Sequence, residues 1–201
     1  MAVMLLATLT ATADDSPNAR QARRIFDKAY NQVFGPEGSR LKYDVNIIGL
    51  YKTRGTICLK GKKQRFTDER VDAWNDGQTA YMVYRKKKTV EIHAANSDKK
   101  DKYSGRFKFS LDDFSYRIAE DPEGLMITLK QLKSAKGSIK EVRALIDRKT
   151  FAPIRLRVKV AFIWTTVKIS DFSAGGVSDD VFVFPQSRYA SGYKFVDKRK
   201  N

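Results

Sequence analysis

The sequence predicts a mainly β protein of the α+β type. A curved, incompletely closed antiparallel β-barrel of about eleven strands should carry an N-terminal helix as a lid over a hydrophobic cavity. Three observations predict this fold: apolar and polar residues alternate over most of the chain, turn residues separate these segments, and only one segment has helical spacing. Because nearly every strand has one apolar face and a single helix covers little area, the sheet should curve around an apolar cavity.

The composition narrows the class of protein. The chain has 201 residues, of which 42% are hydrophobic, and 39 lysines and arginines against 23 aspartates and glutamates give a net charge of +16. One cysteine and one histidine exclude an internal disulfide framework and a Cys/His zinc cluster. The sequence indicates no other metal or cofactor. The positive charge favours an acidic partner, with nucleic acid as the first candidate.

The first 13 residues have the pattern of a secretory signal peptide. They carry no charge, contain an apolar run over residues 2–9, and end in small residues at Ala11 and Ala13, which predicts cleavage after Ala13. Residues 14–201 should form a single domain, since no linker or repeat interrupts them. Export would separate the chain from chromosomal nucleic acid, so we expect no nucleic-acid partner.

One amphipathic helix opens the predicted domain. Ser16 can cap its start, and Pro17 suits the first helical position. Apolar residues then recur at intervals of three and four as far as Phe34. Gly35 is expected to end the helix in the left-handed conformation.

The rest of the chain has a period of two, which is typical of an antiparallel meander. Asp76-Gly77 predicts a hairpin in which both residues have positive φ, and residues 103–111 fit either a short helix or a lid. Residues 179–184 are a final apolar segment, and residues 193–196 are a last short strand. The other predicted strands cover residues 41–47, 51–60, 63–67, 71–75, 79–84, 89–93, 114–118, 125–129, 139–147, 154–160 and 164–172.

The apolar sides of these strands form the candidate binding site. For any one residue the pattern fits a cavity wall and an ordinary core position equally well. Trp74 and Trp164 fall on the opposite alternation, which favours ordinary sheet packing over a cap on the rim. The candidate cavity-lining residues, which would contact a long apolar ligand, are Tyr43, Val45, Ile47, Ile57, Leu59, Phe66, Phe114, Tyr116, Ile118, Leu156, Val158 and Ile169.

Nothing in the sequence predicts a catalytic residue. His93 has no Ser or Asp motif beside it that could orient a general base. Cys58 lies within a strand and is expected to be a small apolar filler. The adjacent carboxylates at 112–113 and 179–180 would face opposite ways on a strand, which is poor geometry for a shared acid/base or metal site.

Six sequence stretches together resemble the outer-membrane lipoprotein carrier (LolA) family of Gram-negative bacteria. They follow the family's order from the N-terminal helix to the C-terminus. The resemblance rests on this shared order rather than on any single stretch. The stretches are GTICLKG at 55–61, AWNDGQTAYMVY at 73–84, IDRKTFAPI at 146–154, WTTVKISDF at 164–172, VFVFP at 181–185 and FVD at 195–197.

The resemblance implies a non-enzymatic periplasmic carrier, or chaperone, for lipoproteins. Acyl chains would sit in the hydrophobic cavity, and the partners would be an inner-membrane release complex and the outer membrane. We expect a monomer. The chain departs from the family at Tyr81, where a Trp is usual, and at Gly61-Lys62, where the family has an Arg-Pro that holds the lid shut. The lid-closing arginine is therefore not carried over.

Two other functions stay open on the sequence. A basic polyanion or nucleic-acid-binding protein would account for the charge, although the basic residues cluster mainly in turns and at the C-terminus rather than among exposed aromatics. An envelope sensor of the same fold would read lipoproteins instead of carrying them. The charge could also attract anionic lipid headgroups or an acidic docking partner.

Overall fold

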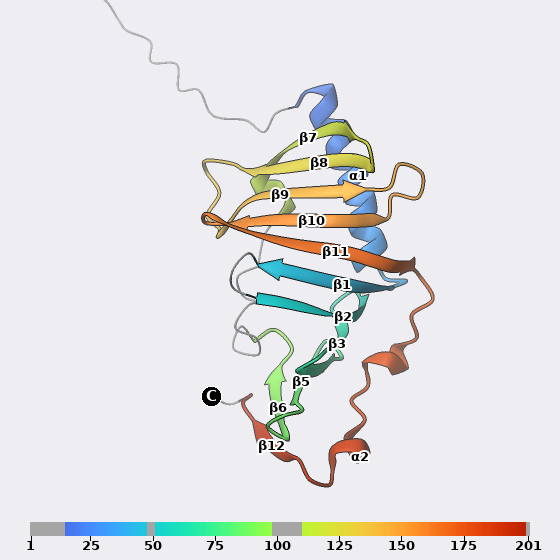
Figure 1. The fold of residues 1–201 in the computed structure, drawn as a ribbon, viewed down its shortest axis with the longest axis vertical. Coiled ribbons are helices and arrows are strands. Elements are labelled where there is room, and N and C mark those ends of the chain that lie inside the picture. The colour runs from blue at the N-terminus through green and yellow to red at the C-terminus, as the bar shows by residue number, and fades with distance from the viewer. Residues whose placement is uncertain (1–14, 48–50, 98–109, 200–201) are drawn as a thin grey trace, which may run out of the picture.

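A computed structural model describes residues 15–47, 51–97 and 110–199 of the chain. Its strands form one sheet, along which α1 (Pro17–Phe34) runs on a single face (Figure 1). The strands are β1 (Ser39–Ile47), β2 (Tyr51–Lys60), β3 (Lys63–Asp68), β4 (Val71–Asn75), β5 (Thr79–Tyr84), β6 (Thr89–Ala94), β7 (Phe114–Asp121), β8 (Gly124–Gln131), β9 (Ile139–Ile146), β10 (Pro153–Val160), β11 (Ile163–Ala174) and β12 (Lys194–Asp197). Three short helical turns complete the described elements: η2 (Leu111–Asp113), η3 (Asp179–Phe182) and α2 (Gln186–Tyr189).

The sheet is open, with β12 and β7 at its two edges. Its order is β12-β6-β5-β4-β3-β2-β1-β11-β10-β9-β8-β7, so the pairing of β1 with β11 joins an early meander to a late one. The predicted fold class is confirmed, with twelve strands in the described residues where about eleven were expected. The antiparallel prediction is wrong for β12, which pairs parallel to β6. No hairpin joins these two strands, since the chain reaches β12 from β11 through η3 and α2.

The register gives the sheet two chemically different faces. Residues that lie opposite each other in neighbouring strands point to the same face. One such row crosses seven strands and is apolar except at its last member: Ile118, Ile127, Ala144, Leu156, Val167, Val45 and Thr53. We call the face that carries this row the helix face, because α1 packs on it, and the other the opposite face.

The helix α1 begins and packs as the sequence predicts. The Ser16 side chain accepts a hydrogen bond from the Ala19 amide at 3.2 Å. Ala22, Phe26 and Ala29 are buried against β7, β8 and β9. The helix ends at Gly35 as predicted, but Gly35 is not left-handed: its φ is −68°, and the left-handed residue is Gly38, at φ +77°.

The C-terminal segment, residues 175–193, covers the opposite face of β2 to β6. Phe182 of η3 packs with Cys58 and Val177 in one buried cluster, and Tyr189 of α2 packs with Trp74 in another. Residues 179–184, which the sequence marks only as an apolar segment, begin with the helical turn η3 at 179–182. There the Ser178 side chain accepts from the Asp180 amide and starts a 3₁₀ turn.

The turn between β4 and β5 also differs from the prediction. Only Gly77 has positive φ, at +97°. The Asp76 carboxylate accepts hydrogen bonds from the amides of Gln78 and Thr79, both at 2.8 Å, so the connection spans three residues rather than two. None of the helices in the described part of the chain is long and apolar enough to cross a lipid bilayer.

Candidate functional site

All twelve candidate cavity residues lie on strands, and the register places every one of them on the helix face. Tyr43 lies opposite Ile169, Leu156 lies in one row with Val45, and Tyr116 lies in one row with Val158. Ile57 and Phe66 lie on the same face, because Leu41 lies opposite Ile57 and Ile57 lies opposite Phe66. The structure thus brings together residues from six strands that are up to 126 positions apart in the sequence (Tyr43 to Ile169).

The helix α1 divides these residues into two groups. Phe114, Tyr116 and Leu59 are buried, so the structure makes them core. Eight others are half-buried, and the side chain of Ile47 is outside the described part of the chain. The half-buried residues are Tyr43, Val45, Ile57, Phe66, Ile118, Leu156, Val158 and Ile169. That they line a ligand cavity stays a prediction.

The helix covers one end of the strands more than the other. At its C-terminal end, Gln32 donates to the Thr150 carbonyl at 2.8 Å, and Ser39 donates to the Val33 carbonyl at 2.7 Å. These contacts place α1 over the ends at which β9 finishes and β1 begins, as Figure 1 shows. Val160 and Ile163, at the far end of β10 and β11, stay half-buried on the helix face.

Tyr43 illustrates how this face is kept uncharged. Burial, followed by the nearby Asp68 carboxylate, raises the pKa of Tyr43 to about 12, so its phenol stays neutral. Gly55 lies opposite it. A Cβ there would come within 2.8 Å of the Tyr43 hydroxyl and would overlap the Thr67 carbonyl oxygen, so only glycine fits beside this ring. A neutral phenol above a bare backbone is compatible with an apolar ligand.

Asp68 marks a polar boundary of the helix face. Its carboxylate accepts hydrogen bonds from the backbone amides of Arg70 and Val71 at 2.7 and 2.8 Å and from the Thr53 hydroxyl at 3.1 Å. The Arg70 guanidinium lies 3.3 Å from it. The charge is therefore satisfied locally and does not face the apolar row unpaired.

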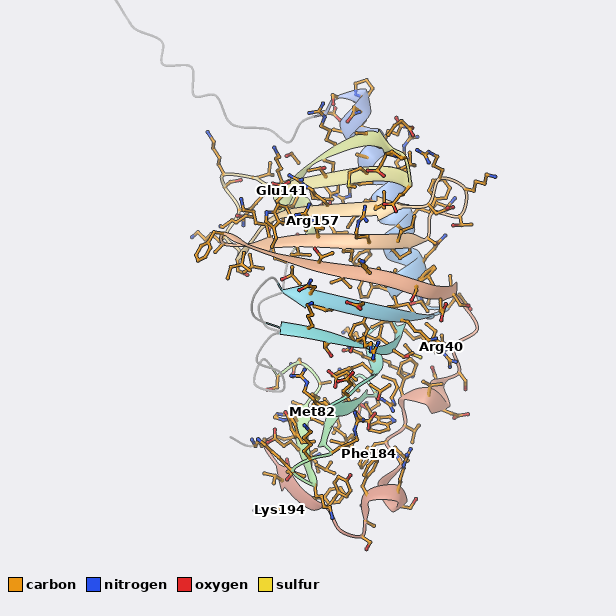
Figure 2. All side chains as sticks on the ribbon, in the orientation of Figure 1. Arg40, Met82, Glu141, Arg157, Phe184 and Lys194 are labelled. Carbon is orange, nitrogen blue, oxygen red and sulfur yellow. The ribbon has the colours of Figure 1, made fainter. Side chains whose placement is uncertain are left out.

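The opposite face of β9, β10 and β11 is charged, and sequence reasoning missed it. Trp164 lies there with three cations near its ring centroid: the Arg157 guanidinium at 4.8 Å, the Arg143 guanidinium at 5.0 Å and the Lys159 ammonium at 5.9 Å. Figure 2 shows Arg157 and Glu141 on the side of the sheet turned away from α1. The signal was available, since these cations alternate with the apolar residues Val142, Val158 and Val160.

A hollow of about 820 Å³ lies on β1, β2, β3, β10 and β11. Its lining side chains on the opposite face include Lys42, Arg54, Arg155 and Lys168. Val45, Val167 and Ile57, their apolar neighbours on the helix face, do not line it. We therefore assign this hollow to the opposite face. It is separate from the candidate cavity, although Tyr43 and Ile169 contribute to its lining.

The residues considered for catalysis are held in structural contacts. His93 is 1% exposed, and its Nε2 lies 3.1 Å from the Glu91 carboxylate, which also pairs with Lys198 at 2.8 Å. Cys58 is buried beside Phe182. In the described ranges, no three His, Cys, Asp or Glu side chains gather as a metal site would require.

The carboxylate pairs also have separate partners. Asp112 lies 2.9 Å from the Arg23 guanidinium. Asp179 pairs with Lys60 and Lys63 at 3.0 and 2.9 Å, and hydrogen bonds from these two lysines hold its pKa below its usual value. These contacts tie η2 to α1 and η3 to β2 and β3, so they stabilise the fold.

Comparison with known proteins shows similarity of fold. No protein-family model matches the chain, and no curated protein matches its sequence. An uncharacterized conserved protein from Thermus thermophilus superposes with a TM-score of 0.59 at 9% identity, over 89% of this chain and 99% of its own. That similarity shows a shared fold.

Two further solved structures are similar at lower scores. A putative outer membrane lipoprotein-sorting protein domain from Vibrio parahaemolyticus has a TM-score of 0.46 at 10% identity, over 86% of this chain and 99% of its own. A LolA superfamily protein from Nitrosomonas europaea has a TM-score of 0.40 at 9% identity, over 81% and 97%. The architecture expected from the sequence, an open and mainly antiparallel sheet with an N-terminal helix along one face, is what the chain has.

Proposed function

We propose that this protein is an exported carrier that binds acyl chains of lipoproteins on the helix face and delivers them toward the outer membrane. The observation that carries the proposal is the continuous apolar row on that face, from Ile118 in β7 to Val45 in β1, with members that the fold leaves half-buried. Half-buried apolar side chains that gather on one face of a domain are typical of a binding site.

The resemblance of the sequence to the LolA family supports the choice of ligand. Each methylene group of an acyl chain that leaves water contributes about 0.8 kcal/mol before entropy costs. A face that runs across seven strands matches the shape of long unbranched chains better than that of a compact metabolite. The neutral phenol of Tyr43 keeps the middle of this face free of a second charge beside Asp68.

The remaining parts of the proposal follow the sequence. Cleavage after Ala13 would release residues 14–201 into the periplasm as one lipid-binding domain, which we expect to act as a monomer. An inner-membrane release complex would then supply the lipoprotein. The role requires no chemical step, so the side chains bind and release rather than react.

A paired substitution on two neighbouring strands tests the site. Val158→Glu puts a charge on the helix face, whereas Thr166→Glu puts the same charge on the opposite face of the adjoining strand. Because a carboxylate in an apolar site must be desolvated, Val158→Glu should weaken binding of a fluorescent fatty-acyl probe at least about tenfold. Thr166→Glu should bind the probe like the parent protein.

The parent protein supplies the second readout. Organic extraction of the mature chain purified from cells, followed by mass spectrometry, should recover acyl lipids. Circular dichroism establishes whether each variant is folded. Equal probe affinity for both variants, or a parent protein that holds no lipid and ignores the probe, would contradict the proposal.

A further inference from the structure

The tip of the β10–β11 hairpin presents an exposed aromatic side chain. Phe162 is 83% exposed, the highest value among the exposed large hydrophobic residues of the described chain. The preceding Ala161 has φ +53°, and its amide donates to the Ser138 carbonyl at 3.2 Å. The tip is therefore braced against the β8–β9 loop, so Phe162 is held outward by a fixed turn rather than by a loose one.

Basic residues surround this tip. Five lysines and arginines in residues 130–143 and two in residues 157–164 stand against a single carboxylate, Glu141, so these two segments carry a net charge of +6. Glu141 is occupied by the Arg143 guanidinium at 2.7 Å. On the same hairpin, Trp164 is half-buried among its three cations, two residues from Phe162.

We propose that the β10–β11 tip and the β8–β9 loop form a docking edge that binds the surface of an anionic lipid bilayer, with Phe162 inserted between headgroups. Each element has the chemistry that such a surface selects. Lysines and arginines are attracted to anionic headgroups, a Trp beside them suits the membrane–water interface, and an apolar side chain on a rigid turn can enter the acyl region without exposing a helix or strand.

The observations favour a bilayer over nucleic acid. Single-stranded nucleic acid needs a groove with aromatic rings spaced for successive bases. At this edge the exposed aromatic side chain is Phe162 at the hairpin tip, and the Trp164 ring is already contacted by Arg143, Arg157 and Lys159. Insertion of one aromatic side chain into a lipid bilayer requires only the hairpin tip and the basic residues around it.

The docking edge lies at the end of the helix face from which an acyl chain would pass to the membrane. The tip joins Val160 to Ile163, which are half-buried on the helix face at the end opposite the α1 contacts with Thr150 and Ser39. An acyl chain on the helix face could thus leave toward the surface to which the tip is bound. This consequence rests on the proposed function, whereas docking itself does not.

Vesicle binding tests the docking edge without any acyl ligand. The full chain should co-sediment with vesicles rich in phosphatidylglycerol and not with pure phosphatidylcholine, and raised salt should release it. Binding should shift Trp164 fluorescence to shorter wavelength, and brominated lipid should quench it. Trp74 is only 4% exposed and should give a constant background.

Two pairs of variants make the test specific. Phe162→Ser should weaken vesicle binding about tenfold or more, whereas Val183→Ser, at a side chain 63% exposed in the C-terminal segment, should not change it. Arg157→Gln with Lys159→Gln should weaken it by a similar factor, whereas Lys86→Gln with Lys87→Gln removes the same charge at the β5–β6 turn and should have little effect.

Three results would overturn the proposal. One is equal binding to neutral and anionic vesicles, and another is unchanged binding by Phe162→Ser. The third is tight binding of single-stranded DNA with no vesicle binding, which would assign the charge to nucleic acid. Loss of probe binding in Val158→Glu with intact vesicle binding would leave docking in place and separate the two proposals.

Discussion

The two halves of the sheet are covered on opposite faces. The upper half, β7 to β11 with β1, packs its helix face against α1 at Phe26 and Ala22. The lower half, β2 to β6 with β12, packs its opposite face against the C-terminal segment, where Trp74, Val83 and Val90 meet Tyr189. Figure 1 shows α1 behind the upper strands, and α2 beside the lower ones.

This difference explains where apolar surface stays accessible. Among the described residues, each half has one cover, and the two covers come from opposite ends of the chain. The opposite face of the upper half has no cover among the described residues and is charged, as Arg157 and Lys168 show. The helix face is apolar beyond the reach of α1, at Val45 and Val167, and these residues stay half-buried. If one cover extended over the whole helix face, these apolar side chains would be buried.

Removal of the α1 anchor should have the largest effect. Phe26→Ala deletes a ring that packs edge-on against the Tyr116 ring, with 6.0 Å between the ring centroids. Because Phe26 is buried, the substitution should lower the free energy of unfolding by about 4–5 kcal/mol. Hydrogen exchange should rise first in β7 and β8 if the halves are stabilised separately. Gln21→Ala, on the exposed side of the same helix, serves as the control. Uniform loss of protection across both halves would contradict this division.

Removal of the C-terminal anchor should affect the other half. Phe182 is 1% exposed beside Cys58 and Val177, so Phe182→Ala should cost about 3–4 kcal/mol in denaturant unfolding. Protection should fall in β2 and β3 before β8. The neighbouring Val183→Ala changes a side chain that is 63% exposed and should be nearly neutral. A larger effect in Val183→Ala would mean that η3 is not anchored by Phe182.

Asp72 links stability of the lower half to pH. Burial alone would raise its pKa, but hydrogen bonds from Thr67 and Arg85, with the charge of Arg65, hold the pKa below its usual value. The carboxylate therefore stabilises the fold above its ordinary pKa of about 3.9, and this contribution is lost as pH falls below that value. Asp72→Asn should cost about 1–3 kcal/mol at neutral pH.

The pH profile provides the check on Asp72. The difference in unfolding free energy between the parent and Asp72→Asn should shrink in acid and be constant near neutrality. Asp44→Asn, on an exposed strand position of the upper half, should show a much smaller difference. A constant difference at every pH would show that the carboxylate charge does not stabilise β3, β4 and β5.

The cap of α1 should have the smallest effect. Ser16 accepts from the Ala19 amide, so Ser16→Ala should lower the stability by about 1 kcal/mol. Thermal unfolding by circular dichroism measures it, with the exposed Ser187→Ala as control. An unchanged melting temperature would show that Pro17 and the packing of Phe26 fix the start of α1 without the cap.

Much of the fold followed from the sequence because its signals are local. The helix ends at Phe34 as predicted, and the period of two placed Tyr43, Val45 and Leu156 on a common face. The alternation also set Trp74 and Trp164 on the other face. The predicted positive φ was wrong at Gly35 and at Asp76. At Asp76 the carboxylate accepts a hydrogen bond from the Gln78 amide, which the dipeptide pattern does not predict.

The sequence by itself determined which side chains share a face, since neighbouring residues on a strand must point in opposite directions. Only the tertiary structure decided which face is covered, because each cover is a contact between segments far apart in the chain. Phe26 with Tyr116 and Phe182 with Cys58 are such contacts. The gathering of Arg143, Arg157 and Lys159 around Trp164 also needs three paired strands, and only their register brings these charges together.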